Sequence, residues 1–442
     1  MKVRVYDEDV REFVVQQKGV FIVLSHDPNF NKNLRSTMVR HLHTKDDCVY
    51  TVITQEQLHR QLRLLGDQGR RIVFFLEREI NGKSCNELLQ YTKAHYPQVM
   101  VVILTNEVAR DALVYLHEIG ASNIITKPIS PDMLIEKIAF TIKPRGQIGE
   151  LIDAGKSYNE HGRHEDAATL ARQVLELKPN SPAAYILLGD SQRLMGQMDK
   201  ARASYEEASR HGKLYLEPYR KLAELHKETG DVRTETGYLE KLDQLSPLNL
   251  ERKVNIGVNY LSLGEKDLAD EHFEGALKLA VKEASSQVGR VSNMIAEQCL
   301  ALDPEVSEKY LRQALEARKG HLDKSDLETF NRLGITLRKQ GLWHKAIEEY
   351  RKALSISAIN PTILYNMSLA FSEGKKYAEA CRHMDQALQF DPELGADSEI
   401  VCYNIALIYS GCKNSEICAD YLRKALEINP DFQKAKAMLR DL

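Results

Sequence analysis

Residues of matching size recur every 34 positions over the last two thirds of the chain, and this period constrains the fold more than any other feature of the sequence. Each unit has a small residue, a large residue three places later, and an alanine nine places beyond that. Units of this length that repeat in phase are typical of helical arrays in which each unit packs on its neighbours. The small residues are Gly155, Gly189, Ala223, Gly257, Gly334, Ser368 and Ala406.

The alternation of small and large residues has a physical reason. Two antiparallel helices approach closely only where one presents a small side chain, and a large side chain beside the crossing fills the remaining space. Tyr205, Phe273 and Tyr350 occupy the large position of second helices. A glycine between paired helices predicts a left-handed residue that ends the first helix. These glycines are Gly162, Gly196, Gly230, Gly264 and Gly341.

This region resembles the tetratricopeptide repeat family, whose period is 34 residues. The resemblance implies an all-α solenoid over residues 146–442, with a final cap helix over Phe432–Leu442. In the fifth repeat Ile295 replaces the small residue, and extra residues over Val281–Val288 and Arg318–Lys324 predict longer or tilted helices. We count about eight repeats, beginning near residues 148, 182, 216, 250, 288, 327, 361 and 399.

For function, the resemblance implies a concave groove that binds an extended or helical peptide. The position two before the small residue faces this groove in the family, and it is asparagine in four of the last five units. An asparagine amide has a donor and an acceptor, so it can pair with a peptide backbone whatever the side chain. A solvated polar face is the alternative interpretation. The groove candidates are Asn255, Asn293, Asn366 and Asn404, with Arg332 at the same position of the remaining unit.

The first 145 residues follow a different pattern, in which short apolar runs alternate with helical stripes. Five strands that alternate with five helices predict an α/β fold with a doubly wound parallel sheet. The ligand crevice of such a sheet lies beyond the carboxyl ends of its strands. The runs are Val20–Leu24, Val49–Ile53, Ile72–Leu76, Val99–Leu104 and Asn123–Ile125.

The residues that follow these strands form the candidate site of this region. They are Ser25, His26 and Asp27 after the first run, Glu77 after the third, Thr105 after the fourth and Lys127 after the fifth. The region resembles the receiver domain of bacterial response regulators through Val102–Thr105, Gly120–Asn123 and Ile125–Pro128. The resemblance implies a flavodoxin-like sheet and a phosphorylation switch. In that switch paired carboxylates hold magnesium, an aspartate accepts phosphate, and a hydroxyl and a lysine bind the phosphoryl group.

The sequence departs from the receiver pattern at the positions that carry its chemistry. The acceptor position holds Glu77 in place of aspartate, and the acid pair is Ser25 and His26 with only Asp27 acidic beside it. Magnesium prefers hard oxygen ligands, so the loss of carboxylates removes most of the charge that would hold it. Phosphoryl transfer then lacks its main electrostatic support. We interpret the domain as a pseudo-receiver in which Glu77 pairs with Lys127. Its site remnants are Ser25, His26, Asp27, Glu77, Thr105 and Lys127.

Other signals for metal, cofactor or redox chemistry are weak. Glycine-rich phosphate loops of the GxxxxGK type, HExxH and GxSxG are absent from the sequence. His41 and His43 lie close together without further ligands nearby, so we expect surface residues and no metal site. The seven cysteines are odd in number and form no CxxC pair. We therefore expect reduced thiols, with neither a disulfide framework nor a zinc site.

Charge and hydropathy exclude further classes of protein. The net charge of -3 provides no excess for general binding to nucleic acid or anionic membrane. No segment approaches the ~20 apolar residues of a membrane-spanning helix, and the first residues lack the apolar core of a secretion signal, so we expect a cytoplasmic protein. At the start of the chain, Lys2–Tyr6 predicts an extra edge strand and Asp7–Gln17 a short helix. The joint Lys143–Gln147 carries proline and glycine and predicts a limited range of orientations.

Two function classes follow from these observations. The leading hypothesis is a non-enzymatic bacterial signalling adaptor. In it, the receiver-like domain over residues 1–145 docks a signalling protein, and the repeats over residues 146–442 bind a protein or peptide partner. The alternative is a working response regulator of a two-component system, phosphorylated in its receiver, with protein binding as its output.

Overall fold

The apolar runs of the first part of the chain form one five-stranded parallel sheet, in the order β2-β1-β3-β6-β7. The computed structural model describes residues 6–442 except 45, 82, 107–108, 144–145, 213–214, 284 and 320–321. The strands of the sheet are β1 (Val20–Leu24), β2 (Val49–Thr51), β3 (Ile72–Glu77), β6 (Met100–Thr105) and β7 (Asn123–Thr126). The doubly wound sheet predicted from the sequence is therefore present, with the flavodoxin-like strand order.

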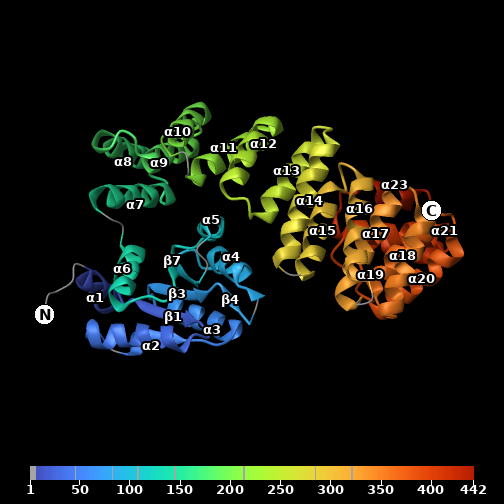
Figure 1. The fold of residues 1–442 in the computed structure, drawn as a ribbon. Coiled ribbons are helices and arrows are strands. Elements are labelled where there is room, and N and C mark those ends of the chain that lie inside the picture. The colour runs from blue at the N-terminus through green and yellow to red at the C-terminus, as the bar shows by residue number, and fades with distance from the viewer. Residues whose placement is uncertain are drawn as a thin grey trace. The chain divides into compact units, whose positions relative to one another are not determined.

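Helices cover both faces of this sheet (Figure 1). They are α1 (Asp7–Val15), α2 (Pro28–Ser36), α3 (Gln55–Asp67), α4 (Asn86–His95), α5 (Arg110–Glu118) and α6 (Pro131–Ile142). Successive side chains of a strand point to opposite faces. In β3, Val73 and Phe75 pack with α1, α2 and α6, whereas Phe74 and Leu76 pack with α3, α4 and α5. Burial of both faces explains why the strands are apolar throughout.

Local sequence signals predict only part of the secondary structure of this domain. The predicted short helix is α1, whereas the predicted strand over Lys2–Tyr6 lies, apart from Tyr6, outside the described residues. Ser130 caps α6, because its hydroxyl accepts the backbone N–H of Met133 at 3.3 Å. A small hairpin of β4 (Glu79–Ile80) and β5 (Lys83–Ser84) was not predicted, since two-residue strands leave no periodic signal.

The second part of the chain is an all-α solenoid, whose described residues form eight consecutive helix pairs and a last single helix. The first helices of the pairs are α7 (Gly146–Glu160), α9 (Pro182–Leu194), α11 (Leu216–Thr229), α13 (Leu250–Ser262), α15 (Ser285–Cys299), α17 (Leu327–Lys339), α19 (Pro361–Glu373) and α21 (Glu399–Gly411). The second helices are α8 (His164–Leu177), α10 (Met198–His211), α12 (Val232–Leu245), α14 (Lys266–Glu283), α16 (Pro304–Ala317), α18 (Trp343–Ile356), α20 (Tyr377–Phe390) and α22 (Ser415–Ile428), and α23 (Gln433–Arg440) follows them.

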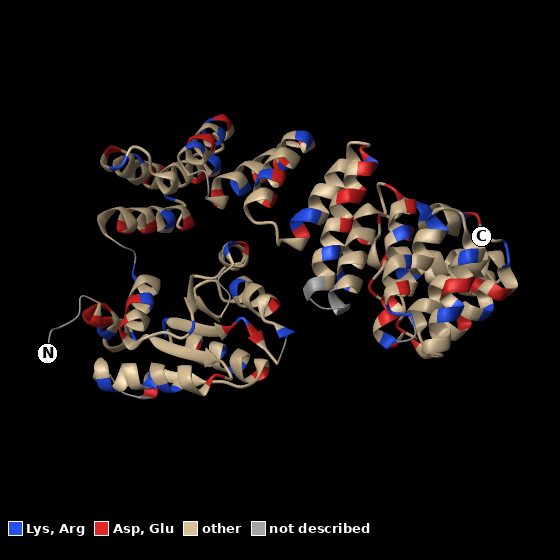
Figure 2. Ribbon diagram, in the orientation of Figure 1, with Lys and Arg blue, Asp and Glu red and all other residues tan. Residues whose placement is uncertain are grey.

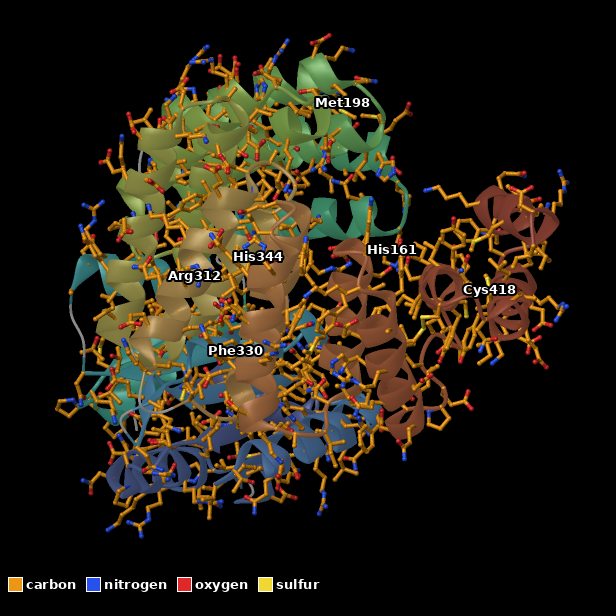
Figure 3. The ribbon with its side chains drawn as sticks, turned by 90° about the vertical axis from the view of Figure 1, so that its right-hand side faces the viewer. His161, Met198, Arg312, Phe330, His344 and Cys418 are labelled. Carbon is orange, nitrogen blue, oxygen red and sulfur yellow. A yellow bond between two sulfur atoms is a disulfide. The ribbon has the colours of Figure 1, made fainter. Side chains whose placement is uncertain are left out.

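The small residues lie where the helices cross, as the period predicted. A Cβ atom placed on Gly189 would overlap the ring of Tyr205, and one on Gly334 would overlap Tyr350. Both rings are fully buried. In the core of the carboxyl-terminal repeats, Phe330 of α17 is 3 % exposed and is labelled in Figure 3.

The turns between paired helices have the left-handed backbone that the glycines predicted. Their φ angles are 76° at Gly162, 75° at Gly196, 74° at Gly230, 81° at Gly264 and 77° at Gly341. In the last two pairs the corresponding residues are Lys375 and Lys413, at φ 57° and 60°. The turn geometry is thus retained where glycine is missing. The irregular region before the fifth repeat contains α14, whose 18 residues make it longer than the other second helices.

The chain divides into two compact units, Met1–Arg252 and Lys253–Leu442. The α/β domain and the first three helix pairs therefore belong to the same unit, whereas the sequence placed the boundary at residue 145. The expected joint Lys143–Gln147 includes residues 144 and 145, which lie outside the described residues. Acidic and basic residues alternate over the helices (Figure 2), as the small net charge leads one to expect. None of the described helices combines the length and apolar character that a membrane-crossing helix requires.

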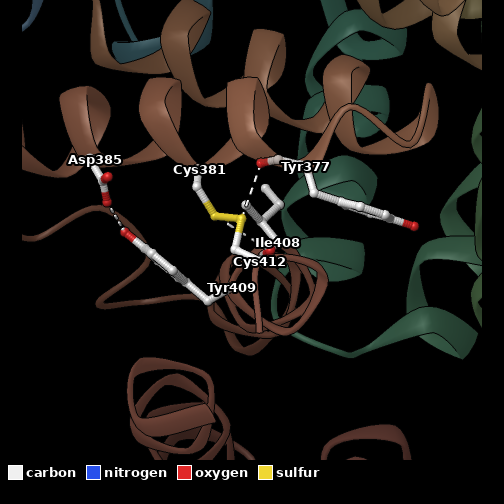
Figure 4. Close-up of a disulfide and its surroundings, with 6 residues drawn as sticks. All are labelled: Tyr377, Cys381, Asp385, Ile408, Tyr409 and Cys412. Atoms are coloured by element: carbon white, nitrogen blue, oxygen red, sulfur yellow. Dashed lines mark hydrogen bonds between the residues drawn. A yellow bond between two sulfur atoms is a disulfide. The ribbon is translucent and has the colours of Figure 1, made fainter. Parts of the chain in front are cut away.

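Cys381 and Cys412 form a disulfide, which corrects the expectation of reduced thiols throughout (Figure 4). Cys381 lies on α20 and Cys412 directly follows α21, with their Cα atoms 6.7 Å apart. Their separation of 31 positions in sequence is close to one repeat length, so stacking of consecutive repeats brings the two side chains together. A search for CxxC spacing does not detect such a pair. Nearby, the Tyr409 hydroxyl donates to the Asp385 carboxylate at 2.5 Å and also joins α21 to α20.

We predict that this disulfide stabilises the carboxyl-terminal repeats. A cross-link that closes a loop of about 30 residues contributes roughly 3 to 4 kcal/mol by restricting the unfolded chain. Reduction with dithiothreitol, or replacement of both cysteines by serine, should lower the melting temperature of these repeats in a thermal unfolding experiment. Dithiothreitol should have no further effect on the double serine variant. Equal melting of the oxidised and reduced wild-type chains would contradict the prediction.

Candidate functional site

The carboxyl ends of the parallel strands bring the candidate residues of the α/β domain to one edge of the sheet. Glu77 ends β3 and Thr105 ends β6, while Lys127 follows β7 directly. Ser25 and Asp27 lie just beyond β1, between that strand and α2. The sequence predicted this convergence because neighbouring parallel strands end at the same edge.

Lys127 is the centre of the site. Its Nζ atom lies 2.6 Å from Glu77 Oε1 and 3.1 Å from Asp27 Oδ2, so the ion pair expected between Lys127 and Glu77 is present. The side chains of Lys127 and Glu77 are only 12 % and 14 % exposed. One ammonium group therefore pairs with two carboxylates in a largely enclosed crevice.

Ser25 connects the Glu77 carboxylate to the backbone of Asp27. Its hydroxyl donates to Glu77 Oε2 at 2.6 Å and accepts the backbone N–H of Asp27 at 3.1 Å. Asp27 in turn caps α2, because its carboxylate accepts the N–H groups of Asn29 at 2.9 Å and Phe30 at 3.3 Å. Both carboxylates are thus fixed by hydrogen bonds as well as by charge, and the small hydroxyl of Ser25 is the reason Glu77 can reach across the crevice.

The two charged partners of this site have shifted pKa values. Partial burial raises the pKa of Asp27, but the hydrogen bonds from Lys127 and from the amides of Phe30 and Asn29 outweigh it, so the pKa is lower than usual. Burial lowers the pKa of Lys127, and the bonds to Glu77 and Asp27 outweigh that effect and raise it. Each partner therefore remains charged over the neutral pH range.

His26 and Thr105 take different places at this edge. His26 is exposed and does not join the Ser25, Asp27 and Glu77 network. Thr105 is buried at 3 %, and its backbone carbonyl accepts the N–H of Lys127 at 2.9 Å. Among the three residues that follow β1, the network therefore contains one carboxylate, that of Asp27.

The room beside the ion pair is small. A cavity of about 90 Å³ is lined by Asp27, Asn29, Phe30, Asn33, Lys127, Pro128 and Ile129. Pockets for cofactors or drug-sized ligands usually measure about 300 to 1,000 Å³. Within the described ranges, no three or more His, Cys, Asp and Glu side chains are grouped as metal ligands. The charged side chains can hold the ends of the strands in position, and the cavity beside them offers little space for a substrate.

In the carboxyl-terminal unit, the predicted groove asparagines connect successive first helices. Asn293 of α15 donates to the Thr329 hydroxyl of α17 at 2.9 Å. Asn366 of α19 donates to Asn331 of α17 at 2.9 Å. Asn404 of α21 likewise donates to the Tyr365 hydroxyl of α19 at 3.0 Å. We call these bonds the amide ladder. They place the asparagines on one continuous face, as sequence periodicity implied.

Contacts within the repeats also occupy hydrogen-bonding groups that the sequence interpretation had assigned to a ligand. Asn366 is only 7 % exposed, and its Oδ1 accepts from Arg338 at 3.2 Å. Arg338 is held in turn by Glu373 at 2.7 Å. Arg332, another groove candidate, is paired with Glu297 at 2.6 Å and with Glu328 at 2.7 Å. Asn255 is exposed on α13.

Two apolar residues on the same face were missed by the sequence analysis. Ile400 and Leu407 of α21 are 59 % and 41 % exposed, and they lie four residues before and three after Asn404. This spacing puts all three on one side of the helix. The signal was available, because α21 also buries Ile405 and Ile408 and is therefore apolar around most of its circumference.

The first helices of the amino-terminal unit present a different surface. Lys221 of α11 lies 2.9 Å from Asp190 of α9, which also accepts from the Tyr205 hydroxyl at 2.8 Å. Arg193 of α9 pairs with Glu224 and Glu228 of α11. These charges satisfy one another.

Comparison with known families identifies the class of the repeats. A family model described as tetratricopeptide repeat matches residues 158–225, and a second of the same description matches residues 250–280, 327–360 and 400–432. The chain therefore contains tetratricopeptide repeats, in agreement with the solenoid and its helix crossings.

Similar curated proteins share only part of their length with this chain. A BBSome complex member BBS4 homolog from Drosophila melanogaster is 28 % identical over 193 residues, which are 43 % of this chain and 38 % of that protein. Intraflagellar transport protein 70A from Homo sapiens is 30 % identical over 95 residues, 20 % and 14 % of the two chains. An aspartyl/asparaginyl beta-hydroxylase from Mus musculus is 22 % identical over 54 % of this chain and 33 % of its own. The chain thus spans less than half the length of these relatives.

Solved structures are also similar to part of this chain. Pseudomonas aeruginosa pilF has a TM-score of 0.33 and 17 % identity, and the match covers 51 % of this chain and 97 % of that one. YrrB, described as a TPR protein with an unusual peptide-binding site, has a TM-score of 0.26 and 17 % identity over 54 % and 98 % of the two chains.

We predict that Glu77 and Lys127 stabilise the α/β domain as a coupled pair. Glu77→Gln or Lys127→Met leaves the other charge in the crevice and should cost about 1 to 3 kcal/mol. The double variant should cost less than the sum of the single variants, by about 0.5 to 3 kcal/mol for residues in contact. Denaturant unfolding of the three variants measures this coupling. Additive effects would show that the pair is not coupled.

The pH dependence of the free energy of unfolding provides a second test of this ion-pair network. Because the pKa of Asp27 is lowered, its stabilising effect is complete above its unfolded value of about 4 and is lost as the pH falls through the lower folded value. The effect of Lys127 is complete below about pH 10.4 and is lost as the pH rises through its raised folded value. Lys143→Met, which breaks an exposed pair with Asp9, is the matched control and should change stability little.

Proposed function

We propose that the chain is a non-enzymatic signalling adaptor of bacterial type, whose repeats bind a protein segment and whose receiver-like domain docks a second protein. The observation that supports this proposal most is the amide ladder with Ile400 and Leu407 beside it. Together they combine fixed polar groups with exposed apolar anchors on consecutive first helices. This combination is typical of surfaces that bind peptides with modest demands on sequence.

The apolar anchors would supply most of the binding energy. Covering a leucine or isoleucine side chain contributes roughly 1.5 to 3 kcal/mol when it is fully buried. A hydrogen bond from the Asn404 amide contributes about 0.5 to 1.5 kcal/mol. The proposed ligand is therefore a segment that covers Ile400 and Leu407 with apolar side chains and presents backbone amides to Asn404.

The amide ladder would also lower the entropic cost of binding. Asn366 and Arg338 are already held by partners within the repeats, so these side chains lose little freedom when a ligand arrives. Preorganised side chains bind more tightly because the ordering cost is met during folding. In this view, Asn366 supports the surface and Asn404 contacts the ligand.

The α/β domain fits a docking role better than a catalytic one. Lys127 forms ion pairs with both Asp27 and Glu77, and the adjoining cavity is only about 90 Å³. A metal ion at this position would have to displace Lys127 and would find two carboxylates only, where magnesium prefers octahedral oxygen ligands. We propose that the pair holds the domain in one conformation for a signalling partner. Phosphorylation of Glu77, as in a working response regulator, is the alternative.

The curated relatives are consistent with an assembly role. One is named as a member of the BBSome complex and another as an intraflagellar transport protein. The matches cover only a minor part of each relative, so they support the proposal for the repeats alone. The third relative is named as a hydroxylase, and the proposal does not extend an activity from it to this chain.

We predict that Ile400→Asp combined with Leu407→Asp abolishes recognition by the carboxyl-terminal repeats. The full chain first captures a partner from cells of its source, and calorimetric titration then measures the affinity of that partner. Loss of two apolar contacts should weaken binding a hundredfold or more, at about 1.4 kcal/mol for each factor of ten. Asn404→Ala should weaken binding up to about tenfold.

A matched control separates this surface from other exposed leucines. Leu194 is 56 % exposed at the end of α9 in the other unit, and Leu194→Asp should leave the affinity unchanged. Thermal melts must show that all variants retain their repeats. Wild-type affinity in the Ile400 and Leu407 double variant would place recognition elsewhere on the molecule.

A further inference from the structure

The α/β domain and the repeats of the amino-terminal unit meet at a second place besides their covalent joint. Glu118, the last residue of α5, accepts a hydrogen bond from Asn249 at 2.8 Å and one from the guanidinium of Arg252. Asn249 and Arg252 lie where the chain passes from α12 to α13. We call the contact of Glu118 with Asn249 and Arg252 the latch. The residues it joins are 131 and 134 positions apart in sequence.

The latch is enclosed and held from several sides. The side chain of Arg252 is 4 % exposed and that of Glu118 is 15 % exposed. Arg252 also donates to the Ser246 carbonyl and lies 3.6 Å from the carboxylate of Asp243. Asn249 is fixed in turn, because its Oδ1 accepts the backbone N–H of Arg252 at 2.9 Å. An arginine so deeply buried needs its carboxylate partners, since an unpaired buried charge is costly.

A small apolar contact accompanies these charges. Leu248 packs against the core cluster of the α/β domain that contains Tyr115 and Ile119. The contact between the domain and the repeats is therefore mainly polar, which is the character of domain interfaces that open and close. Consistent with an incomplete fit, Glu118 Oε2 is buried without a hydrogen-bond partner among the described residues.

The latch lies away from the Lys127 crevice. Helix α5 runs antiparallel to the strands that it connects, as crossover helices in parallel sheets do, so its last residue lies near the start of β7. Lys127 follows the end of β7. A protein docked at the crevice would therefore leave the latch accessible, and the two features are separate.

We propose that the latch is a reversible conformational switch that sets whether the α/β domain is held to the repeats at two points or at one. When the Glu118 carboxylate pairs with Arg252, the domain is fixed both through the chain at residue 146 and through α5. When the pair opens, only the covalent joint remains, and the domain reorients relative to the first three helix pairs. This inference does not depend on the peptide surface of the carboxyl-terminal unit.

Charge reversal in the full chain tests the latch directly. One spin label is attached to an unnatural ketone-bearing residue at exposed position 32 on α2, and a second at exposed position 200 on α10. Pulsed electron paramagnetic resonance then measures the distribution of distances between the two labels. The wild-type chain should give a narrow distribution. Glu118→Arg and Arg252→Gln should each broaden it, because the first places a second cation beside Arg252 and the second removes the charge that holds the Glu118 carboxylate.

Further variants keep this test decisive. Glu118→Gln removes the charge with little change of shape and should broaden the distribution even where a reversal impairs folding. Asp166→Arg breaks an exposed pair with Arg163 at the start of α8 and should leave the distribution narrow. A broad wild-type distribution, or folded Glu118 and Arg252 variants that leave the distribution narrow, would overturn the proposal.

Discussion

The close crossing of paired helices is the constraint on which the repeat structure depends. At Gly257 and Gly334 the first helix has no side chain, and the rings of Phe273 and Tyr350 fill the space that a Cβ atom would need. Any larger residue there would have to push a buried ring aside, which a packed core resists. Because the pairs other than the fifth are built on a small residue at this position, the first helices of consecutive repeats lie in register. That register lets Asn404 on α21 reach a hydroxyl on α19, so the polar face follows from an apolar packing rule.

A single ammonium group has the corresponding role in the α/β domain. Lys127 holds Asp27 and Glu77 together at the ends of strands that would otherwise bring like charges to one edge. Receiver-like chemistry needs that edge to bind a metal and to expose an acceptor, whereas here the carboxylates are occupied by a residue of the chain itself. The extra methylene of Glu77 lets its carboxylate contact both Lys127 and Ser25. Electrostatics at this edge therefore hold the strand ends in position, and we propose that the molecule functions through what its surfaces bind.

Much of this architecture could be predicted from the sequence, and the exceptions have physical causes. The strands were predictable because burial of both sheet faces makes them continuous apolar runs, and the repeats were predictable because packing of helix pairs imposes a period of 34 residues. The Glu77 and Lys127 pair was predictable because parallel strands end together. The disulfide of Cys381 and Cys412 was not, since it arises from stacking of successive repeats and leaves no local spacing. The burial of Asn366 was missed for the same reason: its partners Asn331 and Arg338 belong to another repeat. Whether the asparagines contact a ligand stays a prediction.

The central claim is that the chain holds and positions proteins without phosphoryl chemistry of its own. Intact mass spectrometry of the full chain after incubation with magnesium and acetyl phosphate tests it most directly, with a receiver domain that has an aspartate acceptor as positive control. The account predicts that the control gains phosphate and that this chain keeps its original mass. A phosphoryl group that hydroxylamine removes and that Glu77→Gln abolishes would contradict the account and favour a working response regulator.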